Sequence, residues 1–223
     1  MVNGGKWLRY ILLLRGVNVG GKNKVSMSEL KSLLLAAGFE DIDSYINSGN
    51  LFFTSLKKPE SCISKIRQVL DTNYNFSIPF ALMTKDEYLE ERASLPDWWY
   101  ENLARRDVLF FSCGLDTSNI IDFLNKENFY NEIIYVGKSA IFWGKYDESE
   151  YLKTTYHKKL IKQDFYKEIT IRNGKTFEKI AEFMAKNNRF AFKLKVSLDG
   201  KKDVHNAIRG NNFSYDNAIR TIE

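Results

Sequence analysis

Cysteine and histidine are scarce in this chain of 223 residues, which contains two of each. Cys62 and Cys113 lie far apart in the sequence and form no Cys-x-x-Cys pair, so we expect no disulfide framework. Four such residues, dispersed along the chain, are also too few for a zinc cluster. The sequence therefore predicts no metal site and no cofactor.

Long hydrophobic runs are also lacking. The apolar run from Leu8 to Leu14 is too short to span a membrane and has no signal-peptide cleavage site, so we expect a cytoplasmic protein without membrane association. The net charge is small, because the chain has 33 Lys and Arg and 28 Asp and Glu, which gives +5. Such an excess is compatible with an anionic partner, although the ordinary need for solubility explains it better.

What the chain does contain is a globular composition, with 44% hydrophobic and 27% charged residues. Its length suits one large domain or two small ones. In the first half, apolar periodicity predicts the order strand, helix, hairpin, helix, strand. The expected elements are a strand at 10–14, a helix at 26–37, strands at 42–46 and 51–54, a helix at 59–70, a strand at 76–82 and a further helix at 84–92.

Local signals support these elements. Ser26-x-x-Glu29 and Thr84-x-x-Glu87 are capping boxes that mark helix starts. Pro79 favours a sheet edge for the strand at 76–82, since a missing N–H does little harm there. This element order is typical of the split βαβ, or ferredoxin-like, arrangement.

The second half repeats the same order of elements. Its expected elements are a strand at 108–111, a helix at 117–124, strands at 133–136 and 140–143, a helix at 147–164, a strand at 168–171 and a helix at 176–186. We therefore predict an α+β fold of two tandem ferredoxin-like βαββαβ halves with mixed sheets, plus a C-terminal extension. The predicted domain boundaries are 1–94 for the first half, 95–106 for a connector, 107–188 for the second half and 189–223 for the extension.

The extension alternates apolar residues from Phe190 to Leu198, followed by an Asp199-Gly200 turn. We expect an added edge strand with a loose end, in preference to an arm that dimerises or binds anions.

A glycine-rich loop follows the first strand. Gly16-x-x-x-x-Gly21-Lys22 has the spacing of a P-loop, with Asn23 where Ser or Thr would hold Mg²⁺. We do not expect an NTPase, because the helix starts only at Ser26, no strand ends in a Walker B aspartate, and the sheet is not parallel. Two interpretations stay open: a loop whose backbone amides and lysine bind an anion, or a glycine-dependent turn whose asparagines bond the backbone.

The turn Asn47-Ser48-Gly49-Asn50 should lie beside this loop, because the first two strands of this topology run parallel and end on the same side. The candidate ligand-binding residues of the first half are accordingly Arg15, Asn18, Gly20, Gly21, Lys22, Asn23, Asn47, Ser48 and Asn50.

The second half offers four further candidates. Lys153 and His157 are spaced to share one helix face, although a surface position for His157 is the better interpretation. Arg172 and Asn173 end the last strand before a helix cap at Thr176, a combination suited to binding an anion.

The segments Arg15-Gly-Val-Asn-Val-Gly-Gly-Lys-Asn-Lys-Val25 and Tyr45-Ile-Asn-Ser-Gly-Asn50 closely resemble the family called domain of unknown function 1697. A looser second block contains Gly144-Lys145, Lys153-Thr154 and Thr170-Ile-Arg-Asn173. The resemblance covers residues 8 to about 186 and implies the same fold, but the family has no established activity. The chain departs from it at Gly174, where many members have Trp, and in the tail beyond Asn188.

The leading functional hypothesis is a binding module for an anionic ligand, a nucleotide or RNA phosphate, at the glycine-rich loop. RNA is the weaker partner, because no RNP string occurs. One alternative is an enzyme acting on a phosphorylated small molecule through Lys22, Lys153, His157 and Arg172, and another is a scaffold without a ligand. The oligomeric state stays open.

Overall fold

The computed structural model describes residues 6–129, 131–149, 151–186, 201–210 and 213–216. The chain divides into two compact units, Met1–Ala185 and Lys186–Glu223. The predicted strand from Phe190 to Leu198 and the Asp199-Gly200 turn lie outside the described residues.

The first half has the predicted order of elements. They are β1 (Leu8–Leu14), α1 (Met27–Ala36), β2 (Glu40–Tyr45), β3 (Asn50–Ser55), α2 (Pro59–Asn73), β4 (Phe80–Thr84) and α3 (Lys85–Ala93). Thr84 and Glu87 form the reciprocal capping box expected on α3, and Pro59 opens α2. Ser26 caps α1 by accepting from the N–H of Glu29, which is one of the two bonds of the box expected there. Pro79 lies just before β4, which is an edge strand.

The second half repeats the order with one change. Its elements are β5 (Arg105–Phe111), α4 (Ser118–Lys126), β6 (Ile133–Val136), β7 (Ala140–Lys145), α5 (Thr155–Lys158), β8 (Ile169–Asn173) and α6 (Gly174–Lys186). The single helix expected at 147–164 is wrong: α5 is one short turn, flanked by 3₁₀ turns at Tyr151–Lys153, Leu160–Lys162 and Asp164–Glu168.

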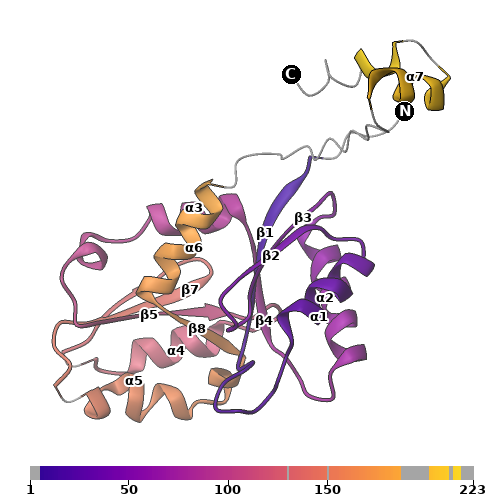
Figure 1. Ribbon diagram of the computed structural model, residues 1–223. Helices are drawn as coiled ribbons and strands as arrows, with labels where there is room; N and C mark the ends of the chain where they lie inside the picture. Colours follow the sequence, from indigo (N-terminus) through magenta and orange to yellow (C-terminus); the bar gives the residue numbers. More distant parts are fainter. Residues whose placement is uncertain (1–5, 130, 150, 187–200, 211–212, 217–223) are drawn as a thin grey trace. The chain divides into compact units, whose positions relative to one another are not determined.

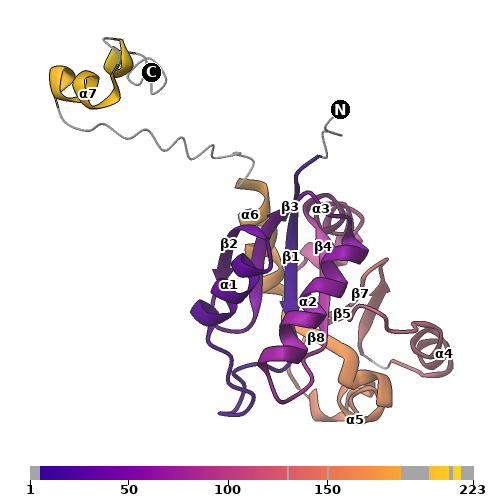
Figure 2. The same ribbon diagram turned by 90° about the vertical axis from the view of Figure 1, so that its right-hand side faces the viewer.

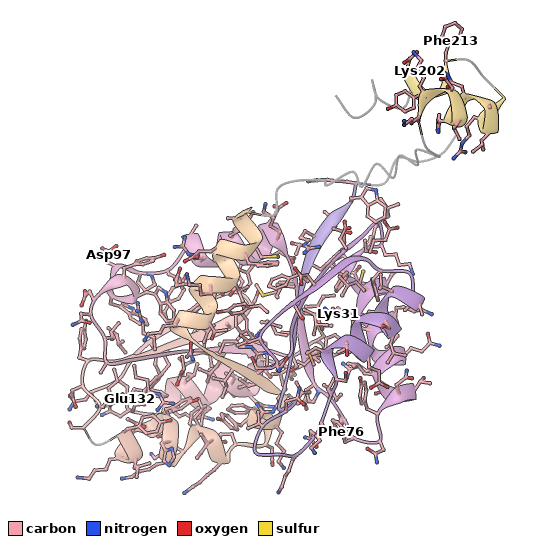
Figure 3. All side chains as sticks on the ribbon, in the orientation of Figure 1. Lys31, Phe76, Asp97, Glu132, Lys202 and Phe213 are labelled. Atoms are coloured by element: carbon pink, nitrogen blue, oxygen red, sulfur yellow. The ribbon has the colours of Figure 1, made fainter. Side chains whose placement is uncertain are left out.

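A partly buried contact accompanies the interruption between β7 and β8. The Glu132 carboxylate, labelled in Figure 3, accepts hydrogen bonds from the backbone N–H groups of Thr155 (2.7 Å) and Tyr156 (3.0 Å) and from Trp143 Nε1 (2.8 Å). These bonds fix the start of α5 to the preceding hairpin, and Thr154 Oγ1 caps it by accepting from the N–H of His157. A side chain from another element thus decides where this helix begins.

Each half contains a four-stranded sheet, with orders β2-β3-β1-β4 and β6-β7-β5-β8. Every neighbouring pair is antiparallel, so the prediction of mixed sheets is wrong. The physical reason is that β1 and β2 run parallel but are not neighbours, because β3 lies between them. The two sheets and their helices are consistent with a two-half ferredoxin-like layout.

Three apolar clusters arrange the layers. On one face of the first sheet, α1 and α2 pack on Tyr10, Leu12 and Phe53. Figure 1 shows the two helices beside that sheet. On the outer face of the second sheet, α4 and α5 pack on Trp143, and Figure 2 shows these helices lying together beside that sheet.

The third cluster joins the two halves. Ile11 and Phe52 from the first sheet meet Phe110 and Phe142 from the second, with α3 and α6 closing the layer. The expected connector contributes to it as well, because Trp99, in a 3₁₀ turn at Asp97–Tyr100, is fully buried. The sequence of β1 is continuously apolar because both faces of this strand are buried, one in each of two apolar clusters.

The second unit contains α7 (Lys202–Arg209), which ends at Gly210 in the left-handed conformation (φ 62°). His205 is buried there, and Lys202 pairs with Asp216 at 2.7 Å.

Across the described residues, no helix has the length and apolar character needed to cross a membrane. The cytoplasmic location stays a prediction.

Two glycines with positive φ differ in the space around them, so comparing them distinguishes backbone strain from steric crowding. A Cβ on Gly49 (φ 76°) would lie 2.8 Å from Leu14 Cβ and 2.8 Å from Val17 Cγ2, whereas one on Gly20 (φ 58°) would meet nothing within 4 Å. We predict that Gly49→Ala lowers the free energy of unfolding by about 2–4 kcal/mol, from left-handed strain plus overpacking. Gly20→Ala should lower it by only about 1–2 kcal/mol. Urea unfolding measures both, and equal losses would contradict this packing at the β2–β3 turn.

Candidate functional site

The glycine-rich loop closes on itself. The N–H of Asn18 donates to the carbonyl of Asn23 (3.1 Å) and the N–H of Lys22 to the carbonyl of Val19 (3.1 Å). The N–H of Val25 donates to Asn18 Oδ1 at 2.9 Å. In this conformation these three amides bond within the protein, and the side chain of Lys22 is exposed to solvent.

Asn18 also joins the loop to the β2–β3 turn, as the parallel course of β1 and β2 predicts. Its Nδ2 donates to the carbonyls of Val25 (2.8 Å) and Asn47 (2.9 Å). Asn18 (φ 58°) and Asn23 (φ 50°) both adopt the left-handed conformation, which asparagine tolerates better than most residues. The asparagines of the loop thus bond its backbone, as the turn interpretation expects.

Asn50, at the start of β3, is fully buried. Its Nδ2 donates to the carbonyl of Tyr45 (3.0 Å) and to Ser48 Oγ (3.1 Å), and its Oδ1 accepts from Arg172 Nε (2.5 Å). Because Arg172 belongs to β8, the β2–β3 turn is bonded directly to the second half.

The Arg172 guanidinium uses all three of its nitrogens in hydrogen bonds. Nη1 donates to Thr170 Oγ1 (2.9 Å) and to the carbonyl of Ile171 (2.8 Å). Nη2 donates to three carbonyls of the first half, those of Leu14 (3.0 Å), Ser48 (3.1 Å) and Gly49 (3.2 Å). Thr170 Oγ1 donates to the Leu14 carbonyl as well, at 3.1 Å.

Burial lowers the pKa of Arg172 to about 10, so the group is still charged at neutral pH. Its hydrogen bonds within the described residues go to carbonyl, amide and hydroxyl oxygens and not to a carboxylate. Arg172 therefore holds the two halves together and faces no open site. Asn173 has a local role too, because its Oδ1 accepts from the N–H of Thr176 (2.8 Å) in the first turn of α6, which begins at Gly174. The helix cap expected at Thr176 is therefore wrong, since the capping side chain is that of Asn173.

Lys153 and His157 do not share a helix face as expected. Lys153 ends a 3₁₀ turn, and His157 lies in α5 with its ring 5.3 Å from that of Tyr151. The enzyme alternative requires these two residues to meet Lys22 and Arg172, and Arg172 is already fully bonded.

A pocket of about 510 Å³ lies beside the loop, at the junction of the halves. Its walls come from the ends of β1 and β5, from the segments before β4 and β8, and from α2. The lining residues are Arg15, Gly16, Asn23, Arg67, Ser77, Pro79, Ser112, Cys113, Lys167 and Glu168. Three of these side chains are basic and one is acidic. The pocket therefore has a positive excess, and it includes Arg15 and Asn23 from the predicted site.

Aromatic rings support both arginines of the pocket. The Arg15 guanidinium lies 5.1 Å from the centre of the Tyr166 ring, and that of Arg67 lies 4.9 Å from the centre of the Phe80 ring. Arg67 Nη2 also donates to the Cys113 carbonyl at 3.3 Å. Burial lowers the pKa of Arg15, against a smaller opposite effect of Tyr166. In the described part of the chain, neither arginine forms a salt bridge.

The two halves contribute to the pocket at equivalent register positions. Leu14 pairs with Phe80 at the end of the first ladder, and the N–H of Arg15 donates to the Pro79 carbonyl at 2.9 Å. In the second ladder Phe111 pairs with Ile169 in the same way.

The residue after Phe111 completes the correspondence. The N–H of Ser112 donates to the Glu168 carbonyl at 3.1 Å, as that of Arg15 does to Pro79. The next N–H, that of Cys113, crosses to the Phe80 carbonyl of the first half at 2.8 Å. The pocket therefore lies where the residues that follow the two central strands, β1 and β5, come together.

The sequence profile of a family described as "Protein of unknown function (DUF1697)" matches residues 8–142, more than half of the 223 residues. The chain belongs to the DUF1697 family. It is similar to a solved structure, the conserved bacterial protein SP0830 from Streptococcus pneumoniae, at 45% sequence identity and a TM-score of 0.77. That match covers 80% of this chain and 99% of the other. No curated protein matches the chain.

The DUF1697 motifs identified in the sequence thus lead to the right family and an α+β fold. Sequence reasoning missed Arg67, Ser112 and Lys167 as members of the pocket. A signal for Ser112 was present: it follows its strand as Arg15 follows the first strand of the other half. Arg67 and Lys167 carry no such signal, because only the packing of the halves brings them to the pocket.

Arg172 allows a direct test of how the halves are held. We predict that Arg172→Met lowers the free energy of unfolding by about 3 kcal/mol or more, because several buried carbonyls lose their donor. Arg172→Lys should recover part of this loss, since an ammonium keeps the charge but not the planar fork. Guanidinium chloride unfolding measures both, with Lys175→Met at an exposed position of α6 as the control. A loss under 1 kcal/mol for Arg172→Met would contradict the role assigned to this arginine.

Proposed function

We propose that this DUF1697 protein is a binding module for a small molecule that bears phosphate, held in the pocket at the junction of the halves. One observation supports the proposal above all. Arg15 and Arg67 line the same pocket, each rests against an aromatic ring, and neither is paired with a carboxylate within the described residues.

Phosphate suits the chemistry of this pocket. Arginine and lysine side chains are donors only, and phosphate oxygens are acceptors that match the planar fork of a guanidinium. Lys167 adds a third positive charge, with Glu168 as the single acidic residue of the lining. Arginines fixed on rings lose less side-chain freedom when a ligand arrives than free ones would.

The size of the pocket favours a small molecule over RNA. A volume of about 510 Å³ lies within the usual range of small-ligand sites, about 300–1,000 Å³. Recognition of single-stranded RNA instead uses aromatic rings on which bases stack. Here the Tyr166 and Phe80 rings already stack against arginines. A nucleotide fits the proposal, with its phosphate at the arginines.

The glycine-rich loop takes an indirect part in the proposal. It supplies Arg15, Gly16 and Asn23 to the pocket, while the bonds made by Asn18 keep it folded against the β2–β3 turn. The same proposal takes the halves as tandem ferredoxin-like units, supported by their equal strand order and register. Their junction then supplies a site that neither half has alone.

A catalytic role has less support. Cys113 is the one thiol among the described residues that line the pocket, and burial raises the pKa of this thiol, so the reactive thiolate is disfavoured. Neither Lys153 nor His157 is among the described residues that line the pocket.

Ligand-induced thermal stabilisation and titration calorimetry test the proposal, with inorganic phosphate, pyrophosphate, AMP and a short single-stranded RNA as probes. We expect pyrophosphate or AMP to raise the melting temperature. Arg67→Gln should weaken that binding by about tenfold or more, the effect of losing one charge-assisted hydrogen bond. The apo melting temperature and circular dichroism of the variant establish that it is folded.

Two control variants locate the site. Lys65→Gln removes a charge from the same helix as Arg67, at a residue outside the lining given for the pocket, and should leave affinity nearly unchanged. Lys22→Ala should do the same, whereas a phosphate held by the loop tip would lose its lysine. Binding of RNA alone, with a steep salt dependence that Arg67→Gln does not alter, would contradict the proposal.

A further inference from the structure

Ser112 is the unusual member of the pocket. The residue is 5% exposed, and its Oγ has no hydrogen-bond partner within the described residues. A buried hydroxyl without a partner destabilises a folded protein, because it has lost its hydrogen bonds to water and gained none in exchange. Native proteins rarely leave such a group unless it serves another purpose.

The backbone of Ser112 is fixed on both sides. Its N–H donates to the Glu168 carbonyl at 3.1 Å, and its carbonyl accepts from the N–H of Leu115 at 3.1 Å. Of the polar groups of Ser112, the hydroxyl alone lacks a hydrogen-bond partner in the part of the chain that the structure describes. Rotation about the Cα–Cβ bond therefore breaks no hydrogen bond to a described residue, and Ser112 lines the pocket.

The surroundings of Ser112 supply donors in excess of acceptors. Arg15, Arg67 and Lys167 can only donate, and partial burial raises the pKa of the neighbouring Cys113 thiol. Glu168 is the single carboxylate of the lining, and the Ser112 hydroxyl bonds neither to it nor to any other described residue, whereas an anion would bring acceptors alone. The orphan hydroxyl and the unpaired arginines thus require the same kind of partner.

We propose that Ser112 is a ligand-binding residue whose hydroxyl donates to an oxygen of the bound anion. This inference rests on the function proposed above and extends it to the second half of the chain. The ligand then touches Arg15 after β1 and Ser112 after β5, which are the equivalent positions of the two halves. The hydroxyl stays unpaired in the free protein and gains its partner only on binding.

The test is Ser112→Ala, measured in the full chain by melting temperature and by calorimetric titration with pyrophosphate. Removing an unpaired buried hydroxyl should raise the melting temperature of the free protein by about 2 °C or more. The same change should weaken pyrophosphate binding by about tenfold. If Ser112 served folding alone, the substitution would not combine a higher melting temperature with weaker pyrophosphate binding. Ser77→Ala, which removes an exposed hydroxyl, is the control for stability and should leave the free protein unchanged.

Ser112→Thr keeps the donor and should retain most of the affinity, since the added methyl group can extend into the pocket. Affinity that is unchanged in Ser112→Ala but lost in Arg67→Gln would overturn the assignment of Ser112 and leave the anion site in place. No binding of pyrophosphate, phosphate or AMP by the unaltered chain would overturn both proposals. A lower melting temperature in Ser112→Ala would show that the hydroxyl has a partner and would also overturn the inference.

Discussion

The guanidinium of Arg172 extends from the last strand of the second half into the first half and donates to the carbonyls of Leu14, Ser48 and Gly49. A charge buried without a carboxylate is costly, so this arrangement persists only while the carbonyl oxygens surround it. Those oxygens converge only when β1 ends beside the β2–β3 turn. The same hydrogen bonds of Arg172 therefore fix both the position of the halves relative to each other and the shape of that turn.

The pocket is a consequence of this constraint. Arg172 binds the Leu14 carbonyl, and the next residue, Arg15, is the first basic residue of the pocket wall. On the other side, the equivalent end of β5 places Ser112 against the same space. An isolated half would present either the arginines or the hydroxyl. The junction therefore creates a pocket whose lining residues come from both halves, and the glycine-rich loop packs beside it, held by Asn18.

Sequence reasoning succeeded where structure is set by neighbours in the chain. The capping box at Thr84, the proline at the start of α2 and the edge position of β4 follow from local rules, and the strand order follows from element order. It failed where a side chain distant in the sequence determines the local structure. Glu132 is the example, because it binds the backbone N–H groups of Thr155 and Tyr156 within the single helix expected at 147–164. Sequence reasoning also assigned Arg172 to ligand binding, because residue type and position do not reveal that a side chain is buried by another half. The parallel course of β1 and β2 was inferred correctly, but the intervening β3 makes the sheets antiparallel.

The most direct test is to soak crystals of the full chain in tungstate, a tetrahedral dianion that mimics phosphate and gives a strong anomalous signal. We expect an anomalous peak in the junction pocket, within hydrogen-bonding distance of Arg15 or Arg67 and absent from crystals of Arg67→Gln. A peak confined to the tip of the loop at Gly20, Gly21 and Lys22, or no peak in the pocket at saturating tungstate, would contradict the account.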